Sequence, residues 1–317
     1  MAILIGIGVC LNRLATAASQ VALAIATLLG IYLWWKNGKH LILNDDARKY
    51  IKVSYLFFFA TLVSIVDVDN KLYVLQNFFG TWVWRFMVFI LVVAFVKKKV
   101  YLLRILASFL LVYSLDCLTA CYQFFILHEG RGHGFHGDYL DLTAIICMVL
   151  AASVIMLLDK HFEPWIKRIA LISLVASIAG LFGCFGRGAF LVSALVAPTY
   201  LFFYFRSSKK LAAGILAVLV LLGGVIASNP KYVDRLSTTF DTKTNTSNLG
   251  RIWVWKSSLD MYLDHPINGV GLNNWGRYYR SGYQYSEETQ NLSHAHSNYM
   301  QLLAETGTIG FIAFLYF

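Results

Sequence analysis

Long apolar runs separated by short clusters of basic residues constrain this chain more than any other feature. Each run has the roughly 20 residues that an α-helix needs to cross the hydrocarbon core of a bilayer. Hydrophobic residues make up 58% of the 317 residues and charged residues only 14%, which excludes an ordinary soluble enzyme. The sequence therefore predicts an all-α, polytopic transmembrane helical bundle with about eight full spans. The runs lie near residues 17–35, 50–66, 79–96, 101–125, 140–158, 166–184, 189–205 and 211–227.

Two shorter apolar stretches, residues 2–11 and 308–317, reach about half the length of a span. No small-residue cleavage site follows the first, so we expect a partial N-terminal helix rather than a signal peptide. A chain that ended within the second would leave backbone groups unsatisfied in lipid, so we interpret the sequence as C-terminally truncated. We expect a transmembrane bundle over 1–227 and an outer loop domain with short helices over 228–297. The last region, 298–317, is expected to hold a short outer helix and the start of a transmembrane helix.

The orientation of the bundle follows from its basic residues, which gather in alternate short loops. These loops lie at 36–52, 97–104, 160–168 and 206–210, and the positive-inside rule places them in the cytoplasm. The intervening stretches, including 128–139 and 228–297, then face the outer side. The formal net charge of +10 is thus a signal of topology, and no basic patch indicates a nucleic-acid partner.

Two patterns raise the question of a metal site. Asp67 and Asp69 could offer oxygen ligands to magnesium or manganese, and the histidines of "HEGRGHGFHGD" (128–138) could offer imidazoles to zinc. A two-residue acidic spacing is common by chance at a helix end, however, and His128 with Glu129 lacks the HExxH spacing. We therefore expect no metal and no other cofactor. The five cysteines all lie in or beside apolar segments, where free thiols are expected.

The outer segment contains a predicted helix followed by a glycine-punctuated loop. Residues 251–265, "RIWVWKSSLDMYLDH", carry large apolar residues at helical spacing, which predicts an amphipathic helix lying on the membrane or on the bundle. Pro266 ends this helix. The glycines that follow permit either structural turns or a close approach to a ligand, and the sequence leaves both open: Gly269, Gly271 and Gly276.

A pair of histidines precedes the last predicted helix, over 297–305. His296 lies at its start, where unpaired N–H groups and the helix dipole favour an anion. Its ordinary pKa near 6.5 suits proton transfer at neutral pH. His294 is expected to point elsewhere from an extended segment, and Glu305 to be a solvated helix residue.

Three stretches resemble the signatures of the O-antigen ligase and polymerase superfamily, which are integral-membrane glycosyltransferases of bacterial envelopes. They are "FGRGAFL" (185–191), "GRIWVWKSSLDMYLDHPINGVGLNNW" (250–275) and "HAHSNYMQLLAETGTIGFIAF" (294–314). A weaker stretch, "GRGHGFHGDYLDLTAII" (130–146), has Gly137-Asp138 where the family usually has Pro-Asn. Ser297 stands where the family commonly has Asn, which leaves the histidine before it in place.

The resemblance implies that a glycan is transferred from undecaprenyl diphosphate to an acceptor sugar hydroxyl on the periplasmic face of the bacterial inner membrane. It assigns diphosphate binding to Arg187 and Arg251, whose planar guanidinium groups suit phosphate, and general-base catalysis to His296. Secondary candidates are Arg131, as a phosphate or sugar contact, and His294. The residues alone leave open that the arginines bind lipid headgroups and that His296 only caps a helix.

Among the members of this superfamily, the sequence is most like a metal-independent O-antigen ligase, whose acceptor is the lipid A core. The close alternative is an O-antigen polymerase, which uses another lipid-linked repeat as acceptor, and a protein O-oligosaccharyltransferase is less favoured. A solute transporter of related fold is the competing class. A transporter should hold its charges at mid-membrane in broken helices, whereas the charges singled out above lie in outer loops and at helix ends.

Overall fold

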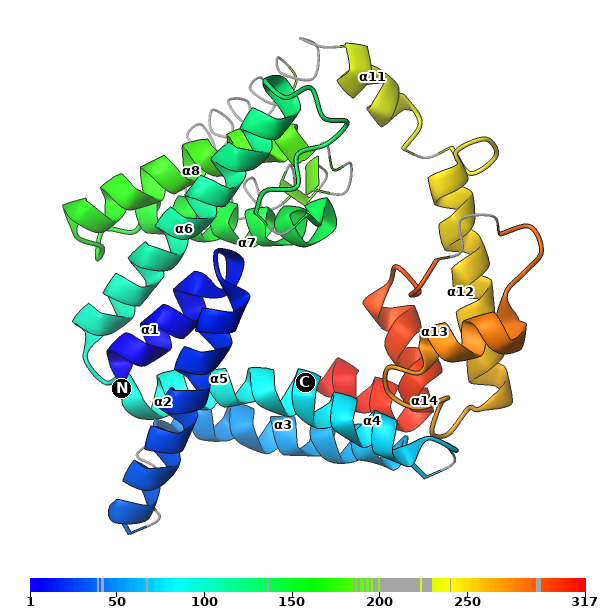
Figure 1. The fold of residues 1–317 in the computed structure, drawn as a ribbon, viewed down its shortest axis with the longest axis horizontal. Coiled ribbons are helices and arrows are strands. Elements are labelled where there is room, and N and C mark those ends of the chain that lie inside the picture. The colour runs from blue at the N-terminus through cyan, green and yellow to red at the C-terminus, as the bar shows by residue number, and fades with distance from the viewer. Residues whose placement is uncertain are drawn as a thin grey trace. The chain divides into compact units, whose positions relative to one another are not determined.

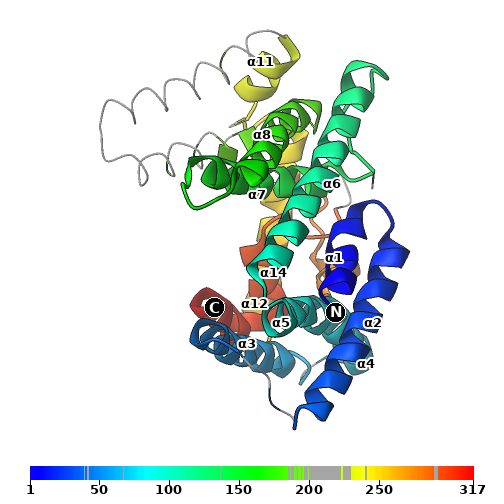
Figure 2. The same ribbon diagram turned by 90° about the vertical axis from the view of Figure 1, so that its left-hand side faces the viewer.

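The computed structural model describes residues 1–38, 40, 43–66, 68–135, 137–184, 186, 189, 190, 192, 193, 195, 199, 223, 230–239, 241–288 and 292–317. Throughout these residues the regular elements are helices (Figures 1 and 2). They divide into two compact units: the first contains Met1–Gly38 and Phe95–Thr239, and the second contains Lys39–Ala94 and Phe240–Phe317. The predicted spans at 189–205 and 211–227 lie almost entirely outside the described residues.

The first unit contains a short N-terminal helix pair and three long helices. α1 (Ala2–Cys10) continues through a 3₁₀ turn (Leu11–Arg13) and packs against α2 (Thr16–Lys36) and α6 (Lys99–Phe125). α7 (Tyr139–Leu158) and α6 both pack against α8 (Pro164–Cys184), and α11 (Pro230–Ser237) follows later in the chain (Figure 1).

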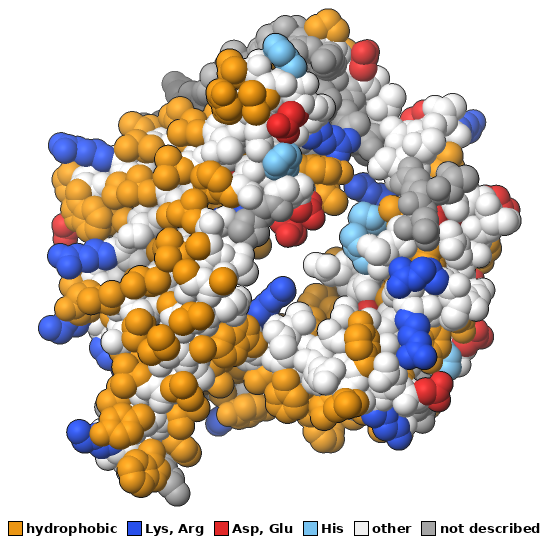
Figure 3. Space-filling model, in the orientation of Figure 1, with side chains coloured by type: hydrophobic (Ala, Val, Ile, Leu, Met, Phe, Trp, Pro, Cys, Tyr) orange, Lys and Arg blue, Asp and Glu red, His pale blue; other side chains and the backbone are white. Residues whose placement is uncertain are grey.

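Small residues let α8 approach α6 closely, as is common where transmembrane helices cross. A Cβ atom added at Gly180 would lie 2.7 Å from Cβ of Cys117, and one at Gly183 would lie 2.9 Å from the carbonyl carbon of Ala120. The buried hydroxyls of Ser114 and Ser173 share a 2.8 Å hydrogen bond across the same interface. The outer faces of α1, α2 and α6, in contrast, carry many exposed apolar side chains (Figure 3). Such a surface is suited to lipid.

Five helical segments are long and apolar enough to cross a membrane: α2, α6, α7, α8 and the continuous helix Lys71–Phe95. They correspond to five of the predicted spans, and Ala2–Arg13 is a shorter apolar helix, as expected. α3 (Asp45–Val63) covers the predicted span at 50–66 but opens with a run of charged residues and is not among the five. The prediction of an all-α, multi-pass membrane protein is confirmed.

The second unit joins α3 to the helix Lys71–Phe95 and to the C-terminal helices. Lys71–Phe95 comprises α4 (Lys71–Asn77), a π-helical turn (Phe78–Val83) and α5 (Trp84–Phe95). α12 (Thr246–Asp264) and α3 both pack against α14 (Asn298–Tyr316), and α13 (Trp275–Tyr278) continues into a second π-helical turn, Tyr279–Tyr283. Gly307, at φ 60° and ψ −162°, divides α14 into an N-terminal part and a C-terminal part, at the position where the sequence predicts the short helix to end.

The predicted amphipathic helix corresponds to α12, but three of its large apolar residues are not packed within the unit. Its buried side is formed by Gly250, Val254, Ser257, Ser258 and Met261. Trp255, Leu259 and Leu263 are exposed. The unit therefore leaves this apolar face uncovered, and its location on the membrane remains a prediction.

Candidate functional site

Ala295, the residue between the two histidines, forms hydrogen bonds with both α12 and α14 of the second unit. Ala295 is fully buried, and its N–H donates to Oε1 of Gln301 in α14 at 2.8 Å. Its carbonyl accepts a 2.9 Å hydrogen bond from Nε1 of Trp255 in α12. Because both backbone groups of this buried residue are hydrogen-bonded, the segment is fixed at Ala295. The positions of His294 and His296 are thereby tied to α12 and α14 together.

The expectation that His294 points away from His296 is wrong. The two imidazole rings lie side by side, with their centroids 4.0 Å apart and their planes inclined by 44°. The chain bends at His296, whose φ of 51° is not that of an extended residue, so the direction expected from an extended segment does not apply. His294 therefore contacts His296 directly and is exposed on its other side.

His296 adopts a backbone conformation that is unusual for a residue with a side chain. Its φ of 51° lies in the left-handed region, where non-glycine residues are uncommon and cluster at functional sites. The next residue, Ser297, is the N-cap of α14, and its side chain accepts from the N–H of Met300. His296 thus lies just before the helix instead of within its first turn.

The surroundings of His296 favour its neutral form. Burial of the imidazole has the largest effect on its pKa, and the interactions with His294 and Arg251 act in the same direction. Together they lower the pKa of His296 from 6.5 to about 4. Arg251, half-buried in α12, is therefore close enough to act on the imidazole electrostatically. At neutral pH His296 carries no charge and can accept a proton, as a general base must.

Glu305 is not the solvated helix residue that the sequence predicts. It is 4% exposed, and burial raises the pKa of its carboxyl group to about 7. Oε1 of Glu305 accepts from Nε2 of Gln301 at 2.6 Å and from the backbone N–H of Trp275 at 3.3 Å. Because Gln301 also binds Ala295, these hydrogen bonds connect the histidine segment to the loop before α13.

The structure decides the role of two of the loop glycines. Gly269 and Gly271 have positive φ angles of 68° and 90°, and the loop pairs with α14 through hydrogen bonds from Val270 N to Ala304 O and from Gly271 N to Glu305 O. A Cβ atom at Gly269 would overlap the backbone of Glu305 and Thr306. These glycines therefore allow the loop to approach a helix instead of a ligand, and the contact is what buries Glu305.

A polar pocket of about 320 Å³ lies beside the histidine pair in the second unit. It is lined by His294, Gln301, Glu305 and two arginines that sequence reasoning missed, Arg277 and Arg280. A second polar pocket, of about 330 Å³, shares Gln301 and Glu305 with it and extends to Arg85. The signal for Arg277 and Arg280 was present in the stretch "RYYR", whose arginines are three residues apart.

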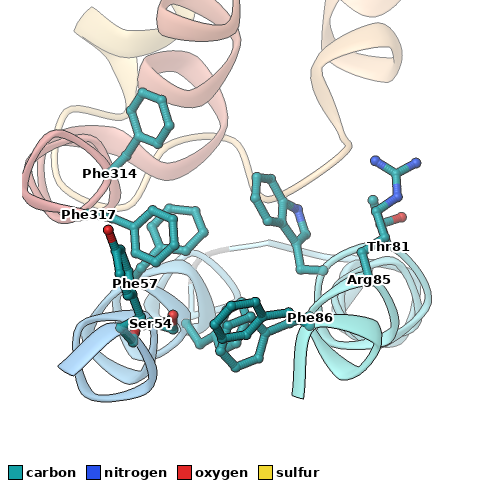
Figure 4. A pocket seen from close by; sticks show the side chains of 11 residues that line it. Ser54, Phe57, Thr81, Arg85, Phe86, Phe314 and Phe317 are labelled. Atoms are coloured by element: carbon teal, nitrogen blue, oxygen red, sulfur yellow. Dashed lines mark hydrogen bonds between the residues drawn. The ribbon is translucent and has the colours of Figure 1, made fainter. Parts of the chain in front are cut away.

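Another pocket of this unit, of about 390 Å³, is mostly apolar. Phenyl rings form most of its wall, including Phe57, Phe86, Phe314 and Phe317, while the guanidinium group of Arg85 points away from them (Figure 4). Few polar groups line this pocket, and neither His296 nor His294 is among its lining residues. The polar pocket next to His294 is therefore the better candidate for sugar chemistry.

The first unit contains Arg131, the secondary candidate of the sequence. Its guanidinium lies over the ring of Tyr139, 4.4 Å from the centroid, in a cation–π contact. The loop that carries it is held by α6: Gln123 Oε1 accepts from the N–H groups of His133 and Gly134, and Oδ1 of Asp116 accepts from the N–H of Phe135 at 2.7 Å. Arg131 is therefore on a loop with a defined conformation.

Asp116 also forms a buried ion pair that the sequence reading overlooked. Its Oδ2 lies 2.6 Å from Nε of Arg13, and the two side chains are 0% and 4% exposed. An ionisable residue within a transmembrane segment almost always faces the bundle interior and a partner. The signal was a lone aspartate in the apolar run 101–125, but its partner, 103 residues away, could be identified only from the fold.

Three candidate residues from the sequence lie outside the described residues: Arg187, His136 and Asp67. The diphosphate-binding role of Arg187 therefore stays a prediction. Among the residues that the structure does describe, no group of three His, Cys, Asp or Glu side chains is placed to hold a metal ion. All five cysteines, which lie within this part of the chain, are free thiols.

Comparison with known proteins gives a match over part of the chain. Residues 172–315, less than half of the chain, match the family described as O-antigen ligase. The matched region includes Arg187, Arg251, His294 and His296 but not Arg131. The match confirms the resemblance of the sequence motifs to the O-antigen ligase superfamily, and the described helices are those of a multi-pass helical membrane protein.

A relative that matches most of this chain is also found. An uncharacterized protein of Haemophilus influenzae is 23% identical over 314 residues, which cover 92% of this chain and 76% of the relative. The similarity therefore extends over both units and well beyond the region that matches the family.

Proposed function

We propose that this protein is an O-antigen ligase that transfers a glycan from undecaprenyl diphosphate to a hydroxyl of the lipid A core, in the periplasmic leaflet of the bacterial inner membrane. The observation that carries the proposal is the environment of His296. Its imidazole is half-buried and neutral, it is held in place through Ala295, and it lies near Arg251. A general base and a fixed positive charge near the membrane are the two groups that this reaction requires.

In the proposed reaction, the acceptor hydroxyl gives its proton to His296 as its oxygen attacks the anomeric carbon of the donor sugar. The bond from that carbon to the diphosphate oxygen breaks, and undecaprenyl diphosphate leaves with the bonding electron pair. Arg251 and Arg187 bind the diphosphate and stabilise the charge that develops on it. For Arg187 this role rests on its motif alone.

Donor binding would also strengthen the base. The positive charges near His296 contribute to its low pKa in the free protein. A diphosphate bound at Arg251 would offset that charge and raise the pKa, because a nearby negative charge favours the imidazolium form. His296 would then hold the proton of the acceptor more firmly during transfer.

An O-antigen polymerase would use the same groups, with a second lipid-linked repeat as acceptor. A solute transporter of related fold is a different class. His296 lies in a loop and Arg251 in α12, both within the segment expected on the outer side, and this location favours chemistry at the membrane surface.

Genetic complementation of a ligase-deficient strain tests the proposal on the complete protein. We expect the wild-type protein to restore long O-chains on the lipid A core, and His296→Ala and Arg187→Ala to fail although they are made and inserted. Full activity of both variants would contradict the mechanism. Accumulation of core carrying a single repeat in a knockout would identify a polymerase, and solute uptake into proteoliposomes without glycan transfer would identify a transporter.

A further inference from the structure

Arg277 and Arg280 form a basic wall in the polar pocket beside His294. Arg277 belongs to α13 and Arg280 to the π-helical turn that follows it, so a spacing of three residues places them on one side of the chain. The guanidinium of Arg280 lies over Gly276, where a Cβ atom would come within 3.7 Å of it. Basic side chains are visible over the part of the surface that carries α13 (Figure 3).

The positive charge of this wall is not balanced by an acidic partner. No salt bridge to Arg277 or Arg280 is found within the described part of the chain. The acidic residues nearby have other partners: Tyr279 donates to Glu288, Tyr283 to Asp264 and Tyr285 to Asp260. Glu305, which also lines the pocket, is buried and bound by Gln301.

The rest of the pocket offers neutral groups that suit sugar hydroxyls. Asn70 and Tyr73 line one part of it, and Asn273 and Ser293 line another. Amide and hydroxyl groups of this kind can both donate and accept hydrogen bonds. The volume of about 320 Å³ is at the lower end of the range of roughly 300–1,000 Å³ that is typical of small-molecule sites.

The position of the pocket relative to His296 distinguishes donor from acceptor. Arg251, the arginine assigned to the donor diphosphate, acts on His296 itself, whereas the pocket is lined by His294, whose ring lies against that of His296. A base that takes a proton from the acceptor must have the acceptor within hydrogen-bond reach. A pocket adjoining the histidine pair is suitably placed for that substrate.

We propose that this pocket binds the acceptor through a sugar that carries an anionic group, phosphate or carboxylate, with Arg277 and Arg280 holding the anion and the neutral side chains holding the hydroxyls. The two arginines determine specificity and position the acceptor; they do not touch the reacting atoms. The inference rests on the proposed glycosyl transfer for the statement that the ligand is the acceptor. Recognition of an anionic sugar can be tested without any transfer.

Direct binding to the complete protein in nanodiscs of zwitterionic lipid tests this recognition. Glucose 6-phosphate, glucuronate and uncharged glucose serve as probes in calorimetric titrations. We expect at least one of the two charged sugars to bind more tightly than glucose, and Arg277→Gln and Arg280→Gln each to weaken its binding about tenfold, the loss typical of a hydrogen bond to a charged group. Arg48→Gln, which removes an exposed arginine at the start of α3, is the matched control and should leave binding unchanged.

Three further variants separate the possible results of this test. His296→Ala should still bind the charged sugar, so that failure of transfer and failure of this inference are separate results. If a glutamine variant is unstable, Arg277→Lys and Arg280→Lys preserve the charge and should retain part of the affinity, because lysine binds phosphate without the bidentate fork.

Transfer kinetics supply the readout that a merely structural role would not change. In the arginine variants we expect the KM for the acceptor to rise about tenfold per arginine while the KM for the donor and kcat stay near wild type. The inference is overturned if the wild-type protein binds glucose as tightly as both charged sugars, or if the variants bind like wild type. It is also overturned if the arginines affect only binding to anionic lipid in nanodiscs that contain it, since they would then contact headgroups.

Discussion

His296 combines an unusual backbone conformation with burial and two neighbours that keep it neutral. Burial, His294 and Arg251 all act in the same direction on its pKa. The left-handed φ costs about 1–3 kcal/mol for a residue with a side chain, and the hydrogen bonds of Ala295 to Trp255 and Gln301 hold the segment in spite of it. A histidine that only capped a helix would need neither feature.

The pH dependence of transfer follows from this environment. A base with a pKa of about 4 is deprotonated throughout the neutral range, so kcat/KM, which reports the free protein, should be flat from pH 6 to 8 and fall only as the pH approaches 4. The measurement is the rate of glycan transfer in proteoliposomes at subsaturating acceptor, with integrity checked at each pH. A decline centred near pH 6.5 would instead indicate a histidine with its ordinary pKa.

Sequence reasoning succeeded for some of these residues and failed for others for identifiable reasons. That His296 lies beside a helix start followed from local patterns alone. The contact between His294 and His296 could not be predicted, because it accompanies a bend of the chain at His296 that the sequence pattern does not show. The burial of Glu305 could not be read from its own helix, because the covering loop begins more than 30 residues earlier in the chain.

At the scale of elements, the loop after α12 depends on glycine to lie against α14. Gly269→Ala should place a Cβ atom in the backbone of Glu305 and Thr306 and strain a residue with φ at 68°. We expect a loss of about 1–3 kcal/mol in stability, seen as a lower Tm of the detergent-solubilised protein. Gly80→Ala is the control, because no atom lies within 4 Å of a Cβ at that position and alanine is favoured in a helix. Equal effects of the two substitutions would contradict the proposed contact.

The ion pair between α6 and the turn after α1 makes a second prediction at this scale. Asp116→Asn leaves Arg13 buried without a counter-charge and should destabilise the protein by about 3–5 kcal/mol. The combined variant Arg13→Met with Asp116→Asn removes both charges, keeps an oxygen that can accept from the N–H of Phe135, and should recover most of that loss. Asp159→Asn, in an exposed pair with His161, is the control. Thermal unfolding measures all three, and a double variant no better than the single one would show that the charges do not act as a pair.

At the scale of the whole molecule, the sequence was most informative about which segments can span a membrane. Helix length and composition are set by the bilayer, so five spans could be predicted without knowing how the helices pack. The division into two units could not be predicted, because it depends on contacts between residues 39–94 and residues 240–317. The pocket proposed for the acceptor could not be predicted either, because α4, α13 and α14 all contribute residues to it.

Cysteine labelling checks the orientation of the bundle. A cysteine in place of Ser286, an exposed residue of the outer segment, should react with a membrane-impermeant maleimide in intact spheroplasts. A cysteine in place of Lys98, in a basic loop, should react only after the membrane is opened. The unsubstituted protein serves as the background, because its five native thiols are buried or partly buried. Labelling of position 98 in intact spheroplasts would invert the topology and remove the site from the periplasm.

The central claim is that His296 is the base for glycan transfer, and reconstituted transfer tests it most directly. The complete protein, lipid-linked donor and lipid A core are combined in proteoliposomes, and the attached glycan is followed with time. His296→Ala should lower kcat by about 10²–10⁴-fold while donor binding is retained, and His294→Ala should have a smaller effect. Transfer by His296→Ala at the wild-type rate would contradict the account.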